Sequence, residues 1–262
     1  MTMKFVDTSS HWELCREESL GLEDMLPSLL ANAGVGEVNL VTVARGSSLR
    51  GREISEEARG LTAAARAEHR ERGFGFWDFV LSSVTKASDD TRIALIRRAL
   101  QHSAAEQQDA LSVDEFVSLL VDGAFQSLPA RTVVSITSRI TGRTDTVPLH
   151  LPMLDFAIHA DYSSDQTAVD VAGALGLSGD LYRSGTSYHL ICDRPVDQLT
   201  LHQVLGRAQL LSPIIDHRWA AHQIIDGFCA LRISTDLERH TSRHRLIAST
   251  RDCGTVDKQI VP

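Results

Sequence analysis

The sequence lacks several features that would assign it to a narrow class of proteins. Its 262 residues contain no run of about 18 apolar residues, and the beginning, MTMKFVDTSSHWELCREE, has no basic segment followed by an apolar one. The first absence argues against a membrane-spanning helix, and the second argues against a secretory leader. We therefore expect a cytoplasmic protein without a membrane partner.

Cysteine and positive charge are also scarce. The cysteines Cys15, Cys192, Cys229 and Cys253 are far apart and form no Cys-x-x-Cys pair, which argues against a zinc or redox site and predicts buried thiols. The formal charge of −8 argues against nonspecific coating of nucleic acid, because phosphate contacts need clustered Lys and Arg. The segment 239–251, RHTSRHRLIASTR, is locally basic and fits either a solvated tail or a basic groove.

Apolar residues make up 43% of the chain, which is ample for a buried core, and no repeat or low-complexity tract is present. Residues 1–130 are predicted to be mainly helical, with one strand at 38–44. Residues 131–262 are predicted to form an α+β core with a basic C-terminal tail. The chain therefore divides, on sequence alone, near residue 130.

The N-terminal region carries several helix signals. Helix formers fill residues 54–72 before Gly73, Ser88 precedes an apolar stripe, and Ser112 with Glu115 forms a capping box. The stripe consists of Ile93, Leu95, Ile96 and Leu100. The aromatic run GFGFWDFVLSSV has two interpretations, a helical core or an oligomer or partner surface, and the oligomeric state stays open.

The order of elements changes after Pro129. The alternating, β-branched run TVVSITSRI predicts a strand with a hairpin partner, and a regular series of elements follows. The series is a strand at 151–160, a helix at 164–177, strands at 179–183 and 188–193, a helix at 199–211, an added helix at 217–226, and a strand at 228–234. This β-α-β-β-α-β order predicts an RRM-like or ferredoxin-like antiparallel sheet with helices on one face and the other face available to a ligand.

Three polar residues stand out on this predicted sheet. Asp155 lies within a central strand, where an unpaired carboxylate is costly, and His189 begins a neighbouring strand next to the turn SGTS. Asp216 follows the apolar pair Ile214 and Ile215. Each has a structural alternative: a carboxylate bonded to backbone amides, a core histidine, and the N-cap of the helix at 217–226.

Together these residues resemble the motifs of the archaeo-eukaryotic primase superfamily, over about residues 148–235. MLDFAIH resembles the first, acidic motif, Ser187-Tyr188-His189 the small-x-His motif, and Ile215-Asp216 the apolar-acid motif. The sequence is most similar to a bacterial branch, primase 1D-like, that keeps a single aspartate in the first motif. The resemblance implies a primase-type fold and a catalytic set of Asp155, His189 and Asp216.

The same resemblance implies the ligands. Asp155 and Asp216 would hold Mg²⁺ or Mn²⁺, and the partner would be a nucleoside triphosphate, with DNA or RNA as a further partner. The implied nucleotide-binding residues are Ser184, Gly185, Ser187, His189, Arg218, His222 and Arg232. Gly185 permits a tight turn around a phosphate, and the hydroxyl groups, the amides and His189 supply hydrogen bonds. Arg232 is expected in a strand of the same sheet.

One departure from the superfamily pattern divides the functional expectation. Ala157 occupies the position of the second acid, whereas two-metal nucleotidyl transfer needs carboxylates that hold ions about 3.5–4 Å apart. His159, Asp161 or Asp165 are candidate substitutes, although Asp165 also suits a helix cap. The favoured function is a nucleotide- and metal-binding primase-like protein, for which nucleotidyltransferase activity stays open. The alternative is an inactive nucleotide- or nucleic-acid-sensing module of a bacterial defence or mobile-element system.

Overall fold

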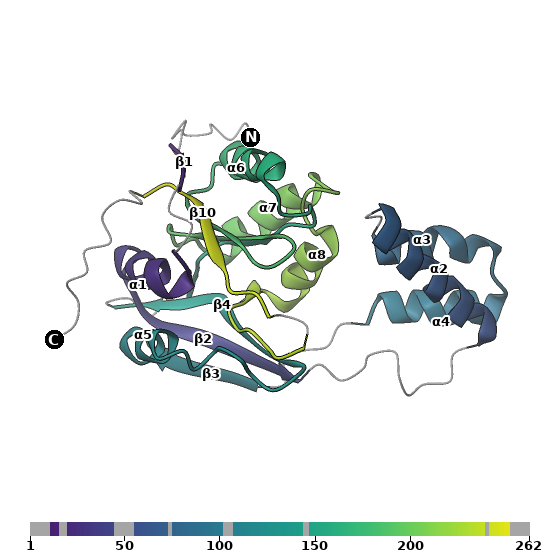
Figure 1. Ribbon diagram of the computed structural model, residues 1–262, viewed down its shortest axis with the longest axis horizontal. Coiled ribbons are helices and arrows are strands. Elements are labelled where there is room, and N and C mark those ends of the chain that lie inside the picture. Colours follow the sequence, from purple (N-terminus) through teal and green to yellow (C-terminus); the bar gives the residue numbers. More distant parts are fainter. Residues whose placement is uncertain are drawn as a thin grey trace. The chain divides into compact units, whose positions relative to one another are not determined.

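A computed structural model describes residues 11–15, 20–44, 55–72, 75–101, 107–143, 147–238 and 241–251 (Figure 1). The chain divides into two compact units, one of residues 1–45 with 105–262 and the other of residues 46–104. The described residues form eight α-helices and two antiparallel sheets, so the predicted α+β class is confirmed. Among the helices in these ranges, none combines the length with the hydropathy that a membrane span requires.

The unit of residues 46–104 is helical. It contains α2 (Glu56–Arg72), α3 (Phe76–Ser83), the 3-10 helix η1 (Val84–Lys86) and α4 (Asp89–Ala99). Its core consists of Ala58, Ala65, Val80, Val84 and Leu95, against which Leu61, Phe76, Trp77 and Phe79 pack. The described aromatic residues of the run, Phe76, Trp77 and Phe79, are therefore partly buried against this core, whereas Gly73 and Phe74 lie outside the described residues. The predicted stripe on α4 is wrong except at Leu95, because Ile93, Ile96 and Leu100 are exposed.

One sheet of the larger unit, here called the β4 sheet, contains the longest strands. Its order is β3-β2-β4-β5, and β9 also pairs with β4. The strands are β2 (Val35–Ala44), β3 (Gln107–Ser112), β4 (Thr132–Gly142), β5 (Leu149–His150) and β9 (Ala230–Arg232), accompanied by helices α1 (Leu22–Asn32) and α5 (Val113–Val121). The Ser112–Glu115 capping box of α5 is confirmed. Residues from both sides of position 130 form this sheet, since β3 pairs with β2 and β2 pairs with β4.

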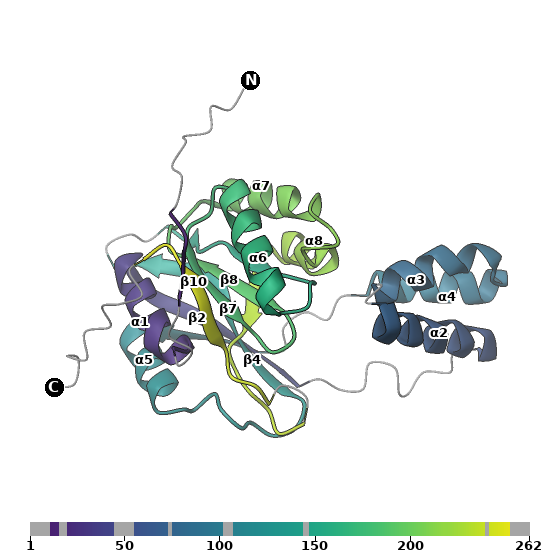
Figure 2. The same cartoon turned by 45° about the horizontal axis from the view of Figure 1, so that its top comes forward.

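The other sheet, here called the β8 sheet, has the order β1-β10-β7-β8-β6. Its strands are β1 (Glu13–Leu14), β6 (Met153–Asp155), β7 (Gly179–Arg183), β8 (Tyr188–Cys192) and β10 (Arg245–Ser249). Three helices accompany this sheet: α6 (Tyr162–Ala174), α7 (Gln198–Gln209) and α8 (His217–Asp226) (Figure 2). The predicted tail within 239–251 is corrected at residues 245–249, which form β10 along the edge of β7. Its apolar residues are buried, which explains why this segment is not solvated.

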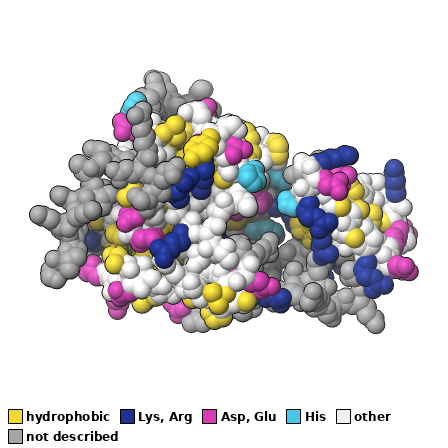
Figure 3. Space-filling view, in the orientation of Figure 1, with side chains coloured by type: hydrophobic (Ala, Val, Ile, Leu, Met, Phe, Trp, Pro, Cys, Tyr) yellow, Lys and Arg dark blue, Asp and Glu magenta, His cyan; other side chains and the backbone are white. Residues whose placement is uncertain are grey.

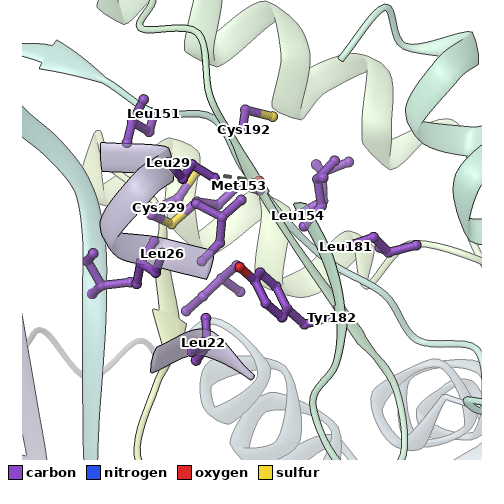
Figure 4. Close-up of a cluster of buried hydrophobic side chains, with 14 of the residues drawn as sticks. Leu22, Leu26, Leu29, Leu151, Met153, Leu154, Leu181, Tyr182, Cys192 and Cys229 are labelled. Carbon is purple, nitrogen blue, oxygen red and sulfur yellow. Dashed lines mark hydrogen bonds between the residues drawn. The ribbon is translucent and has the colours of Figure 1, made fainter. Parts of the chain in front are cut away.

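The register of the β8 sheet decides which side chains share a face. His189 pairs with Asp155 on one side and with Tyr182 on the other, so these three side chains project from the same face. Helix α1 covers part of that face, where Leu22 and Leu26 lie near Tyr182 in the buried cluster of Figure 4. The face expected to be available to a ligand is thus partly covered.

The opposite face of the β8 sheet packs against α6. The Tyr188 hydroxyl donates to Asp165 Oδ1 at 2.7 Å. The pKa of Tyr188 is raised, mainly because the hydroxyl is buried and secondly because of this hydrogen bond. Arg183 binds both oxygens of Asp165 at 2.9 and 2.7 Å. Asp165 therefore anchors α6 to the β7–β8 hairpin, and the cap of this helix is Asp161, which accepts from Ser163 N and Ser164 N.

The cysteines follow the expectation in part. Cys192 and Cys229 are buried free thiols, and burial raises the pKa of both, that of Cys229 to about 12. Cys15 corrects the prediction, because it is disulfide-bonded beside the edge strand β1. Cys253 lies outside the described residues. Figure 3 shows acidic and basic side chains interspersed among the described residues of one face.

Candidate functional site

The turn between β7 and β8 forms one wall of a cavity. Ser184 N donates to Ser187 O at 2.9 Å, and Gly185 has a φ of +112°, a conformation that side-chain-bearing residues rarely adopt. An added Cβ at Gly185 would meet no atom within 4 Å, so the turn faces open space. The sequence-based prediction of a tight, glycine-containing turn at this point agrees with the structure.

Asp155 and His189 lie side by side at this wall. They are directly paired residues of β6 and β8, and His189 Nε2 is 3.7 Å from Asp155 Oδ1. The side chain of His189 is only 9% exposed, whereas that of Asp155 is 25% exposed and reaches the cavity. The expected adjacency of these residues on neighbouring strands is therefore present.

The cavity has a volume of about 630 Å³ and lies between the two sheets. Its lining comes from the hairpin turn, from β4 and β9, from α8 and from the segment before β10. The lining residues are Val133, Ser135, Asp155, Ser184, Gly185, Thr186, Ser187, His189, Trp219, Ala230, Leu231, Arg232, Thr241 and Ser242. A space of this size is in the range of small-molecule sites.

Arg232 connects the two sheets at the cavity. It was expected in the same sheet as His189, but β9 pairs antiparallel with β4, where Arg232 is opposite Ser135. The length of β4 explains the difference, because its edge offers hydrogen-bonding groups to β9. The buried guanidinium donates to Ser184 O and, at 2.5 Å, to Ser234 O. Arg232 thus holds the hairpin turn against the β4 sheet and also lines the cavity.

Asp216 has the structural role that its position in the sequence allowed. Its Oδ1 accepts from Arg218 N at 3.0 Å and Trp219 N at 2.9 Å, which caps α8. Its backbone N–H donates to Asp155 O at 3.0 Å, so the backbone segments that carry Asp155 and Asp216 lie side by side in space. The cavity lining, as far as the structure describes it, does not include Asp216, Arg218 or His222.

The three residues considered as substitutes for the missing acid either make other interactions or lie outside strand β6. Strand β6 ends at Asp155, so Ala157 and His159 are exposed residues beyond the strand. Asp161 caps α6, and hydrogen bonds from the Ser163 hydroxyl and Ser164 lower its pKa to about 2. Asp165 forms an ion pair with Arg183.

Sequence reasoning missed Trp219 and His244. Trp219 Nε1 donates to Ala230 O at 3.2 Å, which fixes the indole ring at the cavity wall. Its place in the first turn of α8, three residues after Asp216, was a usable signal, because a cap fixes the direction of the residues that follow it. His244 lies next to His189, and nothing in the local sequence indicates this long-range contact.

The acidic residues at the cavity limit the metal chemistry. No cluster of three or more His, Cys, Asp or Glu side chains in the described ranges is arranged to hold an ion. Mg²⁺ commonly takes one or two carboxylates and completes its shell with phosphates and waters. Asp155 therefore fits a single ion shared with a bound phosphate group. The residues present do not fit a pair of ions held by protein carboxylates.

Comparisons with known proteins give a family for the chain. No curated protein and no solved structure matches the chain. The family model described as archaeo-eukaryotic primase 1D-like matches residues 112–245, which include the hairpin turn, Asp155, His189 and Arg232. The match spans about half of the chain and runs from the cap of α5 to the start of β10. The chain therefore belongs to the archaeo-eukaryotic primase 1D-like family.

Proposed function

We propose that the cavity binds a nucleoside triphosphate together with one divalent cation, as part of a primase-type nucleotidyltransferase site with a reduced set of acids. The observation that carries this proposal is the meeting of Asp155 and His189, 3.7 Å apart, beside a turn of small hydroxyl residues at the cavity. Family membership supports the same chemistry.

The fold assignment that accompanies this proposal is an RRM-type core made of β6, α6, β7, β8, α7 and β9. The hydrogen-bonded order β7-β8-β6 supports it, because an RRM-type sheet places its second, third and first strands in that order. The last strand differs, since β9 hydrogen-bonds to β4. On this assignment the cavity lies between the sheet that contains β6 and the strand β9, which an RRM-type fold would place next to β6.

The phosphates would bind at the hairpin turn. Thr186 and Ser187 offer hydroxyl groups, the turn offers backbone amides, and His189 offers a ring nitrogen. Arg232 adds a fixed positive charge at the wall of the cavity. A cation on Asp155 would neutralise phosphate charge and polarise a phosphoryl oxygen. The chain's own residues orient the phosphates and exclude water from one side of them.

A melting experiment tests this proposal. A nucleoside triphosphate at about 100 times its Kd stabilises a protein by about 2.7 kcal/mol, which raises the Tm by roughly 5–10 °C for a domain of this size. We expect such a rise with Mg²⁺ or Mn²⁺, a loss of the rise in His189→Ala, and a loss of its metal dependence in Asp155→Asn. His159→Ala is the matched control and should behave as the wild type. The absence of a rise with every nucleotide would refute the proposal.

Trp219 is expected to stack on the base. Its half-buried ring lines the cavity, and stacking on an aromatic side chain contributes about 1–3 kcal/mol per base. Trp219→Ala should therefore weaken nucleotide binding about 5- to 150-fold, as measured by calorimetry. Nucleotide should also quench the tryptophan fluorescence of the wild type and of Trp77→Phe, but not of Trp219→Phe. Equal quenching in all three proteins would place the base elsewhere.

A second function, nucleotide sensing without turnover, is favoured by one observation. Asp216 is occupied as a helix cap and Ala157 carries no acid, so the described cavity offers Asp155 as its carboxylate. Incorporation of labelled nucleotide on DNA and RNA templates separates the two functions. Metal-dependent product that disappears in Asp155→Ala establishes the transferase, whereas tight binding with no product establishes the sensor.

A further inference from the structure

A second buried histidine lies directly behind His189. His244 Nε2 is 3.3 Å from His189 Nδ1, and the two ring centroids are 5.2 Å apart with a tilt of 42°. The tilt and the nitrogen separation are those of a hydrogen bond between rings that are not stacked. His189 therefore has Asp155 next to one ring nitrogen and His244 next to the other.

The position of His244 is fixed by the strand that follows it. Arg245 pairs with Arg183 and Leu246 with Tyr182, so β10 holds His244 close to the β7–β8 turn. His244 is only 4% exposed to solvent. Leu22, Phe125 and Ile233 share with it a cavity of about 20 Å³, which is large enough for about one water molecule but not for a nucleotide. His244 can therefore act on a ligand of the larger cavity through its contact with His189.

The two neighbours of His189 constrain where its proton lies. A neutral imidazole has one N–H donor and one lone-pair acceptor. Asp155 Oδ1 faces His189 Nε2 at 3.7 Å, and a lone pair on Nε2 would be repelled by that carboxylate. The proton of a neutral His189 therefore belongs on Nε2. Nδ1 is then an acceptor, and the His244 Nε2–H is the donor that satisfies it.

We propose that His244 is a positioning residue that holds His189 in the Nε2–H tautomer and fixes its ring orientation. His189 then presents an N–H to Asp155 and to an acceptor oxygen of a ligand in the cavity. The consequence for a nucleotide rests on the proposed function, but the tautomer itself is a property of the protein without ligand. Second residues that orient a functional histidine in this way are a general feature of polar sites.

Two-bond ¹H–¹⁵N NMR spectra of the histidine rings test the tautomer in the full chain. At about pH 8, where an ordinary histidine is neutral, we expect His189 to be entirely the Nε2–H form, with the signal assigned by its loss in His189→Ala. His244→Phe keeps a ring but removes the donor, and should give a mixture of tautomers. His244→Gln keeps an N–H near the same place, and should restore the Nε2–H form. His150→Phe, at another buried histidine that is 3% exposed, should leave His189 unchanged.

Nucleotide affinity supplies a second measurement. By comparison with residues that orient metal-binding histidines, we expect His244→Phe to weaken triphosphate binding roughly 10- to 100-fold and His244→Gln to recover most of it. The double variant His189→Ala/His244→Phe should bind no more weakly than His189→Ala alone, because both changes remove the same interaction. A purely structural residue would lower the Tm without this pattern.

The outcomes separate the two proposals. An Nδ1–H tautomer of His189 in the wild type overturns the role of His244, and so does an unchanged tautomer in His244→Phe. Equal affinity loss in the Gln and Phe variants, when both are folded, also overturns it. The expected tautomers together with no nucleotide binding would support His244 and refute the proposed function. If His244→Phe does not fold, the wild-type and His244→Gln spectra remain decisive.

Discussion

Replacing Arg251 with methionine should destabilise the protein by about 3–5 kcal/mol, because removing one member of a buried ion pair leaves the other charge without compensation. Asp180 is fully buried and binds Arg251, the Ser249 hydroxyl at 2.7 Å and the Tyr182 hydroxyl at 3.0 Å. Arg251 also donates to Ser28 Oγ at 2.8 Å and so joins α1 to the β8 sheet. Urea unfolding at neutral pH measures the loss.

The matched control is Arg243→Met. The ion pair of Arg243 with Glu23 is 3.5 Å long, and the Arg243 side chain is 66% exposed, so its loss should cost less than about 1 kcal/mol. Losses of similar size in the two variants would show that burial does not set the contribution of the Asp180 pair.

The destabilisation of Arg251→Met should depend on pH. Burial raises the pKa of Asp180 above 3.8, although Arg251 acts to lower it. An acid with a raised folded-state pKa contributes stability that is complete below its unfolded pKa and is lost as the pH rises through its folded pKa. Without Arg251 the pKa rises further. The difference between variant and wild type should therefore be large at neutral pH and shrink toward pH 3.8, and a constant difference would contradict this account.

Gly179→Ala should destabilise the protein by roughly 3–5 kcal/mol, through backbone strain and overpacking together. Gly179 has a φ of +146°, and an added Cβ would lie 2.7 Å from the Cys192 Cα and still closer to the Ile191 carbonyl oxygen. Both neighbours are backbone atoms of β8, so neither can rotate away. Because Gly179 pairs with Cys192 in the β7–β8 ladder, the strain falls on the hairpin that carries His189.

Gly206→Ala provides the control for this prediction. Gly206 lies inside α7, and an added Cβ would meet no atom within 4 Å. Alanine is the better helix former, so this variant should gain about 0.5–1 kcal/mol. Thermal and urea unfolding measure both changes. A Gly179→Ala variant within 1 kcal/mol of the wild type would contradict the close approach of β7 and β8.

The sequence was sufficient for those parts of the site that depend on local pattern. The β-α-β-β-α-β order of elements, which is a series of local patterns, predicted that the strands of Asp155 and His189 are neighbours, and β6 and β8 pair in this way. The cap at Asp216 and the hairpin at Gly185 were likewise visible as local signals.

The remaining parts depend on contacts between distant segments. Because β9 pairs with β4, Arg232 lies in the β4 sheet and not in the sheet of His189. Because β10 pairs with β7, the segment that was predicted to be a tail is a strand, and it fixes the position of His244. Neither pairing has a local signature. Asp216 shows a different difficulty, since a carboxylate after an apolar pair suits both a metal ligand and a helix cap, and only the surrounding geometry separates the two.

The insertion of residues 46–104 between β2 and β3 has a consequence for the order in which the chain folds. β2 and β3 are partners from Glu37–Ser112 to Thr42–Gln107, so their pairing closes a loop that contains the whole helical unit. Helices α2 to α4 pack on one another over short sequence separations, and such local contacts form early. Once folded, the insert shortens the effective loop, and closure entropy grows only slowly with length. The kinetics of β4-sheet assembly should therefore tolerate changes in the length of the insert.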